Sequence, residues 1–447
     1  MALTRRKLAG FSALTLASFV ASQAATPAHA EWHPFATTAT KSKGFSHWLS
    51  DITLTGLIDG GIMANPARPT DGYNYGNFFA DHANQAQLNQ VVLTLQKANT
   101  GDASEYQVGF TLQGIYGSDS RYYHLVGISD QEWNARYQLI PAQAHVDVHL
   151  PWATDGGLDM QVGILQAPMG VEVMDPTARP FYTLAYTSQY SVPFEHVGAM
   201  FNWHVNKTVD VTFGIDTGNQ VTFGSSDNNS RPAGYFGINL NNLLGGKLKI
   251  VELSRVGPEN PTSTVAGYGY TGRVSNQAER FWNDINATLQ VNDRLSVTAE
   301  FNYLHDQGTR TPYGSSGPFK SADAWSVVTF LSYVVSPSVT FNYRGEIYRD
   351  NNNLMVTTFT GNNSYMNAIA GRGYTTYSNG GQASDRGTTY GELTLGINYH
   401  PDLGKHVRVF ALRPEIRFDR SLNNTHVFNG GRNNGMFTFG GDAMIGF

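Results

Sequence analysis

The sequence predicts an all-β protein, a transmembrane antiparallel up-and-down β-barrel of about sixteen strands with long external loops and short periplasmic turns. Three observations predict this fold: an amphipathic C-terminal segment that ends on an aromatic residue, an export signal at the N-terminus, and strand-length amphipathic segments between the two. Side chains alternate across a strand, so each such segment offers an apolar face to lipid and a polar face to a lumen.

The C-terminal segment 437–447 carries the clearest alternation. Its apolar residues fall at 437, 439, 443, 445 and 447, with small or polar residues between most of them. Chain ends usually fray, so a chain that stops on such a strand is unusual for a soluble domain. A terminal aromatic residue here resembles the signal by which bacterial outer-membrane barrels are recognised. We therefore expect Phe439, Ile445 and Phe447 to form an assembly signal, with the barrel-assembly machinery as a partner.

The N-terminal segment 1–30 has the three parts of an export signal. Basic residues at 5–7 precede an apolar run over 8–20, and Ala28-His29-Ala30 is a cleavage site of the small-x-small type. The apolar run is shorter than the roughly 20 residues that a membrane-spanning helix needs. We expect a cleaved signal peptide over 1–30, a periplasmic N-terminal tail over 31–50, with a small plug as the alternative, and a transmembrane barrel over 51–447.

The composition favours a membrane barrel over a soluble domain. Charged residues make up 15 % of the chain, against about 25 % in typical soluble domains. Cleavage of the signal removes three basic residues and no acidic one, which leaves 27 basic against 35 acidic residues and a balance of −8. A negative balance argues against a nucleic-acid partner. With no cysteine, an exported chain needs rigidity from another source, and a closed sheet provides it.

Amphipathic segments of strand length recur along the whole chain. The clearest is 339–347, where Val, Phe, Tyr, Gly and Ile alternate with Thr, Asn, Arg and Glu. No segment after the signal is a candidate membrane-spanning helix. We expect strands near 52–62, 86–97, 105–114, 142–150, 158–166, 196–204, 208–217, 234–241, 247–256, 280–291, 295–306, 323–335, 339–348, 391–400, 407–419 and 437–447.

The connections between these segments alternate in length. Short turns, such as 291–294, 336–338 and 401–404, alternate with long polar segments. Outer-membrane barrels have this asymmetry, with short periplasmic turns and long external loops. With an even number of strands both chain ends lie in the periplasm, and every long segment then falls on the external side. The long segments include 63–84, 115–141, 167–195, 257–279 and 349–390.

Several short motifs lie in the first half of the chain. They are Gly56–Gly61 followed by Asn65-Pro66, Leu88–Leu93, Gln143–Asp147 followed by Leu150-Pro151, Gly163–Glu172, and Val192–Gly198. These motifs resemble those of the OmpL-like β-barrel porin family over about residues 50–220. The chain departs from the family pattern at Ile164-Leu165, where a Lys-Phe pair is expected, and at Thr217-Gly218-Asn219, where Asn-Gly is expected. The resemblance implies outer-membrane porin activity and brings no catalytic residues.

Charged residues on inward faces are the candidates for the pore lining. Glu300, Arg344 and Arg413 lie near mid-height when residues are counted from the periplasmic ends of their strands. Charges at the narrowest level of a pore set its selectivity. The alternative is that these charges pair across neighbouring strands and only solvate the wall. The candidates are Arg413, Glu415, Arg417 and Asp419 on 407–419, Arg344 and Glu346 on 339–348, and Glu300 on 295–306.

Segment 167–195 is expected to be the third external loop. In sixteen-stranded porins this loop often folds inward, so the analogy implies a constriction built from it; a loop packed on the rim is the alternative. A carboxylate cluster facing an arginine wall would create a transverse field across the pore. The charged residues of the segment are Glu172, Asp175, Arg179 and Glu195.

A barrel of this strand number is wide enough for a water-filled channel. The sequence therefore predicts a porin in the bacterial outer membrane through which small hydrophilic solutes diffuse passively, without an enzymatic reaction, cofactor or metal. His145 and His149 lie on one strand at roughly 13 Å, given ~3.3 Å per residue, which is too far to share a metal. Lipid and solutes are the partners, and analogy with general porins of this size implies a homotrimer. The alternatives are a substrate-specific nutrient channel and a structural or adhesive barrel with a blocked lumen.

Overall fold

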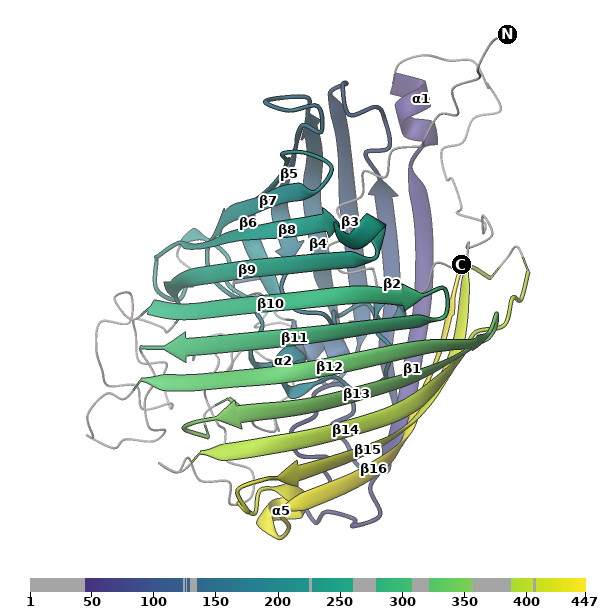
Figure 1. Ribbon diagram of the computed structural model, residues 1–447, viewed down its shortest axis with the longest axis vertical. Coiled ribbons are helices and arrows are strands. Elements are labelled where there is room, and N and C mark those ends of the chain that lie inside the picture. Colours follow the sequence, from purple (N-terminus) through teal and green to yellow (C-terminus); the bar gives the residue numbers. More distant parts are fainter. Residues whose placement is uncertain are drawn as a thin grey trace.

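The computed structural model describes residues 45–123, 125, 127–128, 135–224, 227–259, 279–307, 321–353, 355–356, 387–404 and 407–447. In this part of the chain sixteen antiparallel strands close into one barrel, and each strand pairs with its neighbours in the sequence (Figure 1). The predicted signal peptide over 1–30 and most of the tail over 31–50 lie outside the described residues, as do most of 257–279 and 349–390.

The strands match the sixteen predicted segments one for one, with ends that differ by a few residues. The strands are β1 (Thr53–Ala64), β2 (Ala86–Lys97), β3 (Gln107–Gly117), β4 (Gln138–Leu150), β5 (Leu158–Gln166), β6 (Glu195–His204), β7 (Val209–Asp216), β8 (Ala233–Asn242), β9 (Leu248–Pro258), β10 (Glu279–Asn292), β11 (Leu295–Asp306), β12 (Ala322–Ser336), β13 (Val339–Asp350), β14 (Thr388–Tyr399), β15 (Val409–Ser421) and β16 (Gly435–Gly446). Short helices are α1 (Phe45–Ser50), η1 (Asp119–Tyr122), η2 (Pro176–Ala178), α2 (Tyr186–Tyr190), α3 (Leu243–Gly246) and α5 (Phe428–Gly431).

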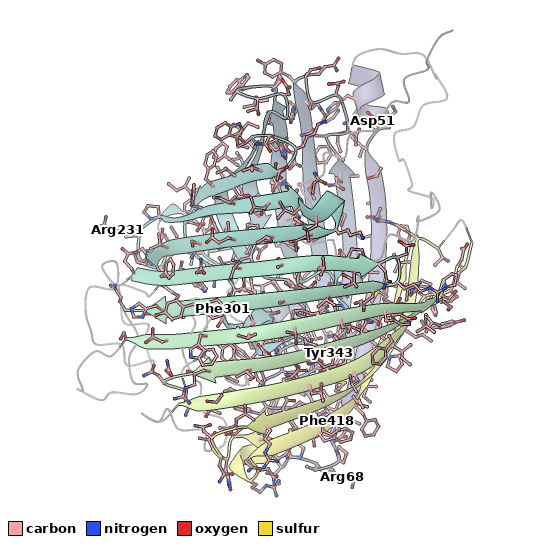
Figure 2. All side chains as sticks on the ribbon, in the orientation of Figure 1. Asp51, Arg68, Arg231, Phe301, Tyr343 and Phe418 are labelled. Carbon is pink, nitrogen blue, oxygen red and sulfur yellow. The ribbon has the colours of Figure 1, made fainter. Side chains whose placement is uncertain are left out.

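The alternation of polarity along each strand fixes which face is wet. On β13, Phe341 and Ile347 are exposed on the outer surface, whereas Asn342, Arg344 and Glu346 are buried inside. Apolar side chains on the outside contact lipid. Because the sheet is closed, the backbone N–H and C=O groups of every strand are paired within the hydrocarbon. Figure 2 shows the outer side chains on the ribbon, with Phe301, Tyr343 and Phe418 labelled on strands β11, β13 and β15.

The first and last strands close the barrel. β1 pairs antiparallel with β16 from Leu57↔Gly446 to Ala64↔Phe439. Beyond the Leu57↔Gly446 pair, Gly56 N donates to Phe447 O at 3.2 Å, and Phe447 N donates to Gly56 O at 3.0 Å. The backbone of Phe447 therefore extends the ladder between β1 and β16 by one residue pair.

The two ends of the barrel differ in their connections. Turns such as 293–294, 337–338 and 243–247 lie at the end where β1 begins and β16 stops, whereas the connections 65–85, 118–137 and 167–194 leave the opposite end. The helix α1 lies beside β3, where Trp48 Nε1 donates to Val108 O at 2.8 Å. None of the helices in the described ranges is long and apolar enough to cross a membrane.

Candidate pore constriction

The connection between β5 and β6 folds into the barrel rather than over its rim. Its helix α2 is fully buried, and Figure 1 shows it behind the strands β11 and β12. The segment contacts inward side chains of β11, β13 and β15, and each contact joins a charged wall residue to the loop. Backbone groups of a loop have no ladder partner, so the wall supplies donors and acceptors instead.

Arg344 on β13 contacts the loop through its charge, its hydrogen bonds and its stacking on an aromatic ring. Its Nη1 donates to Glu172 Oε1 and to Thr183 O, both at 2.7 Å. Its Nη2 donates to Glu392 Oε1 on β14 at 3.2 Å, and its guanidinium lies 5.0 Å from the centre of the Phe181 ring. The guanidinium is wholly buried, so it binds two carboxylates and one carbonyl with water excluded.

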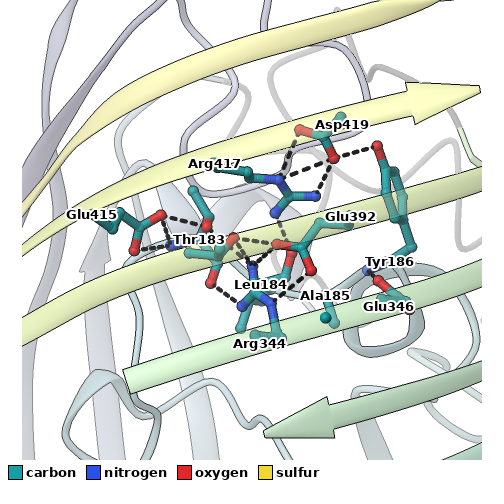
Figure 3. A network of polar contacts seen from close by, with 12 residues as sticks. Thr183, Leu184, Ala185, Tyr186, Arg344, Glu346, Glu392, Glu415, Arg417 and Asp419 are labelled. Carbon is teal, nitrogen blue, oxygen red and sulfur yellow. Dashed lines mark hydrogen bonds and ion pairs between the residues drawn. The ribbon is translucent and has the colours of Figure 1, made fainter. Parts of the chain in front are cut away.

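Arg417 and Asp419 on β15 hold the next part of the loop (Figure 3). Arg417 Nη2 donates to Asp419 Oδ1 at 2.9 Å, and its Nη1 donates to Leu184 O at 2.7 Å. The Tyr186 hydroxyl donates to Asp419 Oδ1 at 2.7 Å. Burial raises the pKa of Tyr186 well above its ordinary value, so the hydroxyl keeps the proton that it donates.

Carboxylates of the wall accept the loop's backbone N–H groups. Glu346 accepts from Tyr186 N at 2.6 Å and from Thr187 N at 2.8 Å. Glu415 accepts from Tyr182 N at 2.8 Å, and Figure 3 shows its carboxylate beside Thr183. A carboxylate that receives two backbone donors fixes the loop as a helix N-cap fixes a helix.

Arg413 and Glu300 bind the first half of the same loop. Arg413 pairs with Asp442 on β16, and its Nη1 donates to Pro176 O at 2.7 Å and Arg179 O at 2.6 Å. Glu300 Oε1 on β11 accepts from Val171 N at 3.1 Å. All seven wall residues singled out in the sequence therefore point inward, and each of them binds the loop directly. Asp419 is also linked to the loop through Arg417.

The four charged residues predicted on segment 167–195 take different positions. Glu172 is buried, pairs with Arg344 and accepts from Ala185 N at 2.7 Å. Asp175 is exposed and caps η2 by accepting from Thr177 N at 2.8 Å. Arg179 stacks at 4.8 Å from the centre of the Phe79 ring. Glu195 is fully buried at the start of β6, so neither it nor Asp175 joins a carboxylate cluster that faces the arginines.

Two other external connections also enter the barrel, which the sequence did not indicate. Phe78 and Phe79 in 65–85 pack on Tyr122 and Tyr123 in 118–137, with ring centres 4.7 Å apart for Phe78–Tyr122. Asp119 accepts from Asn89 Nδ2 at 2.7 Å and from Gln90 Nε2 at 3.0 Å. Burial raises the pKa of Asp119 to about 6, although these donors favour its charged form. The aromatic doublets in both polar segments were the signal that could have shown these loops to be buried.

A cavity of about 130 Å³ remains between the loop and the wall, which is formed here by β1 to β5 with the periplasmic ends of β15 and β16. Its polar lining consists mainly of amides and hydroxyls, because Gln113, Gln143 and Gln166 come from three adjacent strands. Residues 174–177 of the loop close its other side, and Asp175 and Arg408 are its charged lining residues. In the part of the chain that is described, this is a water-accessible region of the lumen beside the inward loop.

Some site residues were not singled out in the sequence. Glu392 and Asp442 are the strand carboxylates that pair with Arg344 and Arg413. Both lie at inward positions of predicted strands, so alternation alone could have identified them. Thr183, whose backbone carbonyl binds Arg344, could not be found in this way because a loop has no periodicity.

No metal centre is present among the described residues. His145 lies 3.1 Å from Asp147, whereas His149 pairs with Asp159 at 2.6 Å, so the two histidines have different partners. Asp159 also contacts His204 at 3.0 Å. His149, Asp159 and His204 form a hydrogen-bonded chain along the inner wall.

A family model described as "Putative beta-barrel porin-2, OmpL-like" matches residues 51–447. The chain belongs to this family. The match extends the resemblance of residues 50–220 over the complete barrel, including the half in which the sequence showed only a general barrel pattern. Among curated proteins, none has a matching sequence.

Solved structures with the same fold are outer-membrane channels. OmpF of Salmonella typhi in complex with daunomycin superimposes with a TM-score of 0.51 and 8 % identity, covering 89 % of this chain and 97 % of that one. The channel DcaP of Acinetobacter baumannii gives 0.50 and 11 %, with 89 % and 97 % covered. The anion-selective porin from Comamonas acidovorans gives 0.50 and 11 %, with 89 % and 99 % covered.

Family and fold together make this protein an outer-membrane porin, a channel for small solutes in the bacterial outer membrane. The family and the fold are those of a channel rather than an enzyme. Its outward apolar surface fits the lipid of that membrane, and its inward polar surface fits hydrated solutes.

Proposed function

We propose that this porin admits small hydrophilic solutes by passive diffusion past a fixed constriction, the loop 167–194. The observation that carries the proposal is the buried ion pair between Glu172 of that loop and Arg344 of β13, together with the hydrogen bonds that charged side chains of β13 and β15 make with the loop backbone. A loop held by charged groups in a place without water keeps one position, and the width of the path beside it then decides which solutes pass.

The wall charges take a positioning role in this proposal. Arg344, Arg413 and Arg417 are at most 2 % exposed, so a solute cannot reach them in this state. Their pairing with the carboxylates of Glu172, Glu392, Asp442 and Asp419 also cancels most of their field. The proposed selectivity therefore does not depend on a transverse electric field across the pore. It depends on the width of the path beside the loop.

Planar-bilayer recording and liposome swelling test the proposal together. Purified protein should give ohmic steps and admit small neutral solutes faster than larger ones. One observation favours the alternative of a blocked structural barrel: three loops pack aromatic side chains such as Phe78, Tyr122 and Tyr190 into the lumen. Bilayers that stay silent at all voltages would favour that alternative, and saturable block by one solute would favour a specific channel.

Assembly and export complete the proposal. Phe439 and Ile445 on β16 and Phe447 directly after it are exposed on the outer face, where the barrel-assembly machinery would bind them. We expect removal of residues 1–30, which N-terminal sequencing of the mature protein measures. We expect a homotrimer, which light scattering in detergent measures. The analogy with other porins supports the trimer.

A further inference from the structure

We propose that the cavity beside the inward loop is a binding site for neutral, multiply hydroxylated solutes of sugar size, held by a belt of glutamine amides. This inference rests on the proposed function, because the cavity would lie on the diffusion path. It adds a solute class to that function, which neither the family nor the fold assigns.

A continuous row of amides and hydroxyls crosses four adjacent strands. Gln166 Nε2 and Gln143 Nε2 both donate to Gln113 Oε1, at 3.4 Å and 3.1 Å. Gln113 Nε2 donates in turn to Thr94 Oγ1 at 2.9 Å. These four side chains are partly exposed and line the cavity. Each primary amide has two donors and two acceptor sites, so the row keeps groups of both kinds for a solute.

One buried group in the cavity wall lacks its partner. Gln90 is fully buried and donates its Nε2 to Asp119 Oδ2 at 3.0 Å and to Met174 O at 3.1 Å. Its Oε1 accepts no hydrogen bond from any residue that the structure describes. A buried acceptor without a donor costs free energy, so this position favours a solute or water that carries a hydroxyl.

Apolar groups complete the complementarity with a sugar. Val92, Ile115 and Met174 line the same cavity beside the amides. A sugar presents C–H groups on its faces and hydroxyls at its edge, and a mixed apolar and amide lining matches both. Asp175 and Arg408 contribute one charge of each sign, so the lining carries no net charge that would favour anions or cations.

The charged side chains of the wall support the same assignment by their burial. The Arg344 guanidinium donates its hydrogen bonds to Glu172, Glu392 and Thr183. The row of glutamine side chains on the opposite wall, in contrast, stays partly exposed. A solute that passes the loop would meet these amides rather than the buried guanidinium groups of Arg344, Arg413 and Arg417. Selection by hydrogen bonding is therefore the chemistry that this side of the lumen offers.

Sucrose is the probe for the test, with isothermal calorimetry and single-channel recording as the two readouts. We expect sucrose to bind the purified barrel and to reduce the ion current in a saturable way. Gln143→Leu should weaken both effects by about 10-fold, as expected for the loss of one or two hydrogen bonds. Gln143→Asn, which keeps the amide, should lose less. Gln161→Leu is the matched control, because Gln161 contacts Asp147 at 2.7 Å and does not line the cavity.

The two readouts separate failure of the site from failure of the porin proposal. A barrel that conducts but neither binds sucrose nor is blocked by it would overturn the solute class and leave the porin intact. Equal sucrose affinity in Gln143→Leu and wild type would also overturn it. Calorimetric binding that disappears in Gln143→Leu supports the site even where bilayers stay silent. Stronger block by a charged solute, such as glutamate, would contradict the neutral lining.

Discussion

Arg344 and Glu172 form a wholly buried ion pair at 2.7 Å across 172 residues of sequence. One partner lies on β13 and the other on the loop between β5 and β6, so the pair forms only in a barrel whose two halves are in place. The loop therefore takes its final position late, after β13 to β15 have joined the sheet. The same pair explains why the loop lies inside: the buried Arg344 guanidinium would keep Glu392 but lose Glu172, one of its two carboxylates, if the loop moved to the rim.

Loss of the Arg344–Glu172 ion pair should widen the path through the channel and lower the stability of the barrel. We expect Arg344→Ala to raise single-channel conductance, because Glu172 and Thr183 lose the donor that holds them. Breaking a buried pair typically costs about 3–5 kcal/mol, so the urea midpoint of the detergent-solubilised barrel should also fall. Arg349→Ala on the same strand is the control, since Arg349 contacts Asn351 at the rim.

Glu172→Gln removes the same ion pair by a change in the loop and leaves Arg344 in the wall unchanged. It should also raise conductance, with a smaller loss of stability, because the amide still accepts from Ala185 N. If both variants lowered the urea midpoint while the conductance stayed at the wild-type value, the loop would not be the constriction.

The chain end gives a second prediction, on assembly. The Phe447 ring covers Gly56, where an added Cβ would lie 2.4 Å from the ring. We expect Phe447→Ala to reduce the amount of folded barrel in the outer membrane while refolding from urea into detergent, which needs no machinery, stays close to wild type. The backbone pairing with Gly56 survives this change, so an equal loss in both measurements would assign Phe447 a role in stability instead.

A matched variant separates packing from recognition. Gly56→Val should impair both refolding and assembly, because its side chain collides with the ring. Adding Phe447→Ala should restore refolding and leave assembly low. Restoration of both would show that the ring matters only through its contact with Gly56.

The strands were predictable because lipid imposes a period of two on them. All sixteen segments, the closed topology and the inward direction of Arg344, Arg413 and Glu300 follow from alternation. A strand with one polar face and one apolar face fits such a wall in only one orientation, with its polar face toward the lumen and its apolar face toward lipid. The prediction therefore needed no knowledge of which strands are neighbours beyond their order.

The loop contacts were not predictable in the same way. Asp175 and Glu195 belong to the same segment as Glu172, yet only Glu172 reaches an arginine. Which carboxylate does so depends on the backbone path of the loop, and no periodic pattern encodes that path. The amide belt was missed for another reason: Gln113, Gln143 and Gln166 read as ordinary wall residues until the strands are in register.

Asp119 gives a prediction for pH. Burial raises its pKa to about 6 in the folded barrel, from an ordinary value of 3.8. The folded state therefore binds this proton more tightly than the unfolded chain, so its contribution to stability is present below about pH 4 and is lost as pH rises through about 6. The difference corresponds to an order of about 3 kcal/mol.

Urea unfolding in detergent at several pH values measures this contribution. We expect Asp119→Asn to remove part of the decline in unfolding free energy between about pH 4 and pH 7. Asp102→Asn, in an exposed turn, serves as the control. A steeper decline in Asp119→Asn than in wild type would mean that the carboxylate is stabilised by its contacts with Asn89 and Gln90 more than it is penalised by burial.

A polar cluster on the outer wall gives the last prediction. Asn283 Nδ2 donates to Glu252 Oε1 at 2.7 Å and to Ser254 Oγ at 2.9 Å. These residues pair with outward positions such as Ile285 and Phe236, so they lie on the face that meets lipid. A carboxyl group in hydrocarbon depends on its donors, because water is absent.

A double-mutant cycle should therefore be strongly non-additive. We expect Asn283→Leu alone to destabilise the barrel by about 1–3 kcal/mol, since Glu252 loses its best donor. Glu252→Leu added to it should recover most of that loss, because two leucines suit lipid and leave no orphaned carboxyl group. The measurement is urea unfolding in phospholipid vesicles, with Ile285→Ala as a control for packing on the same face. Additive effects would mean that water or a partner chain, rather than lipid, covers this part of β9 and β10.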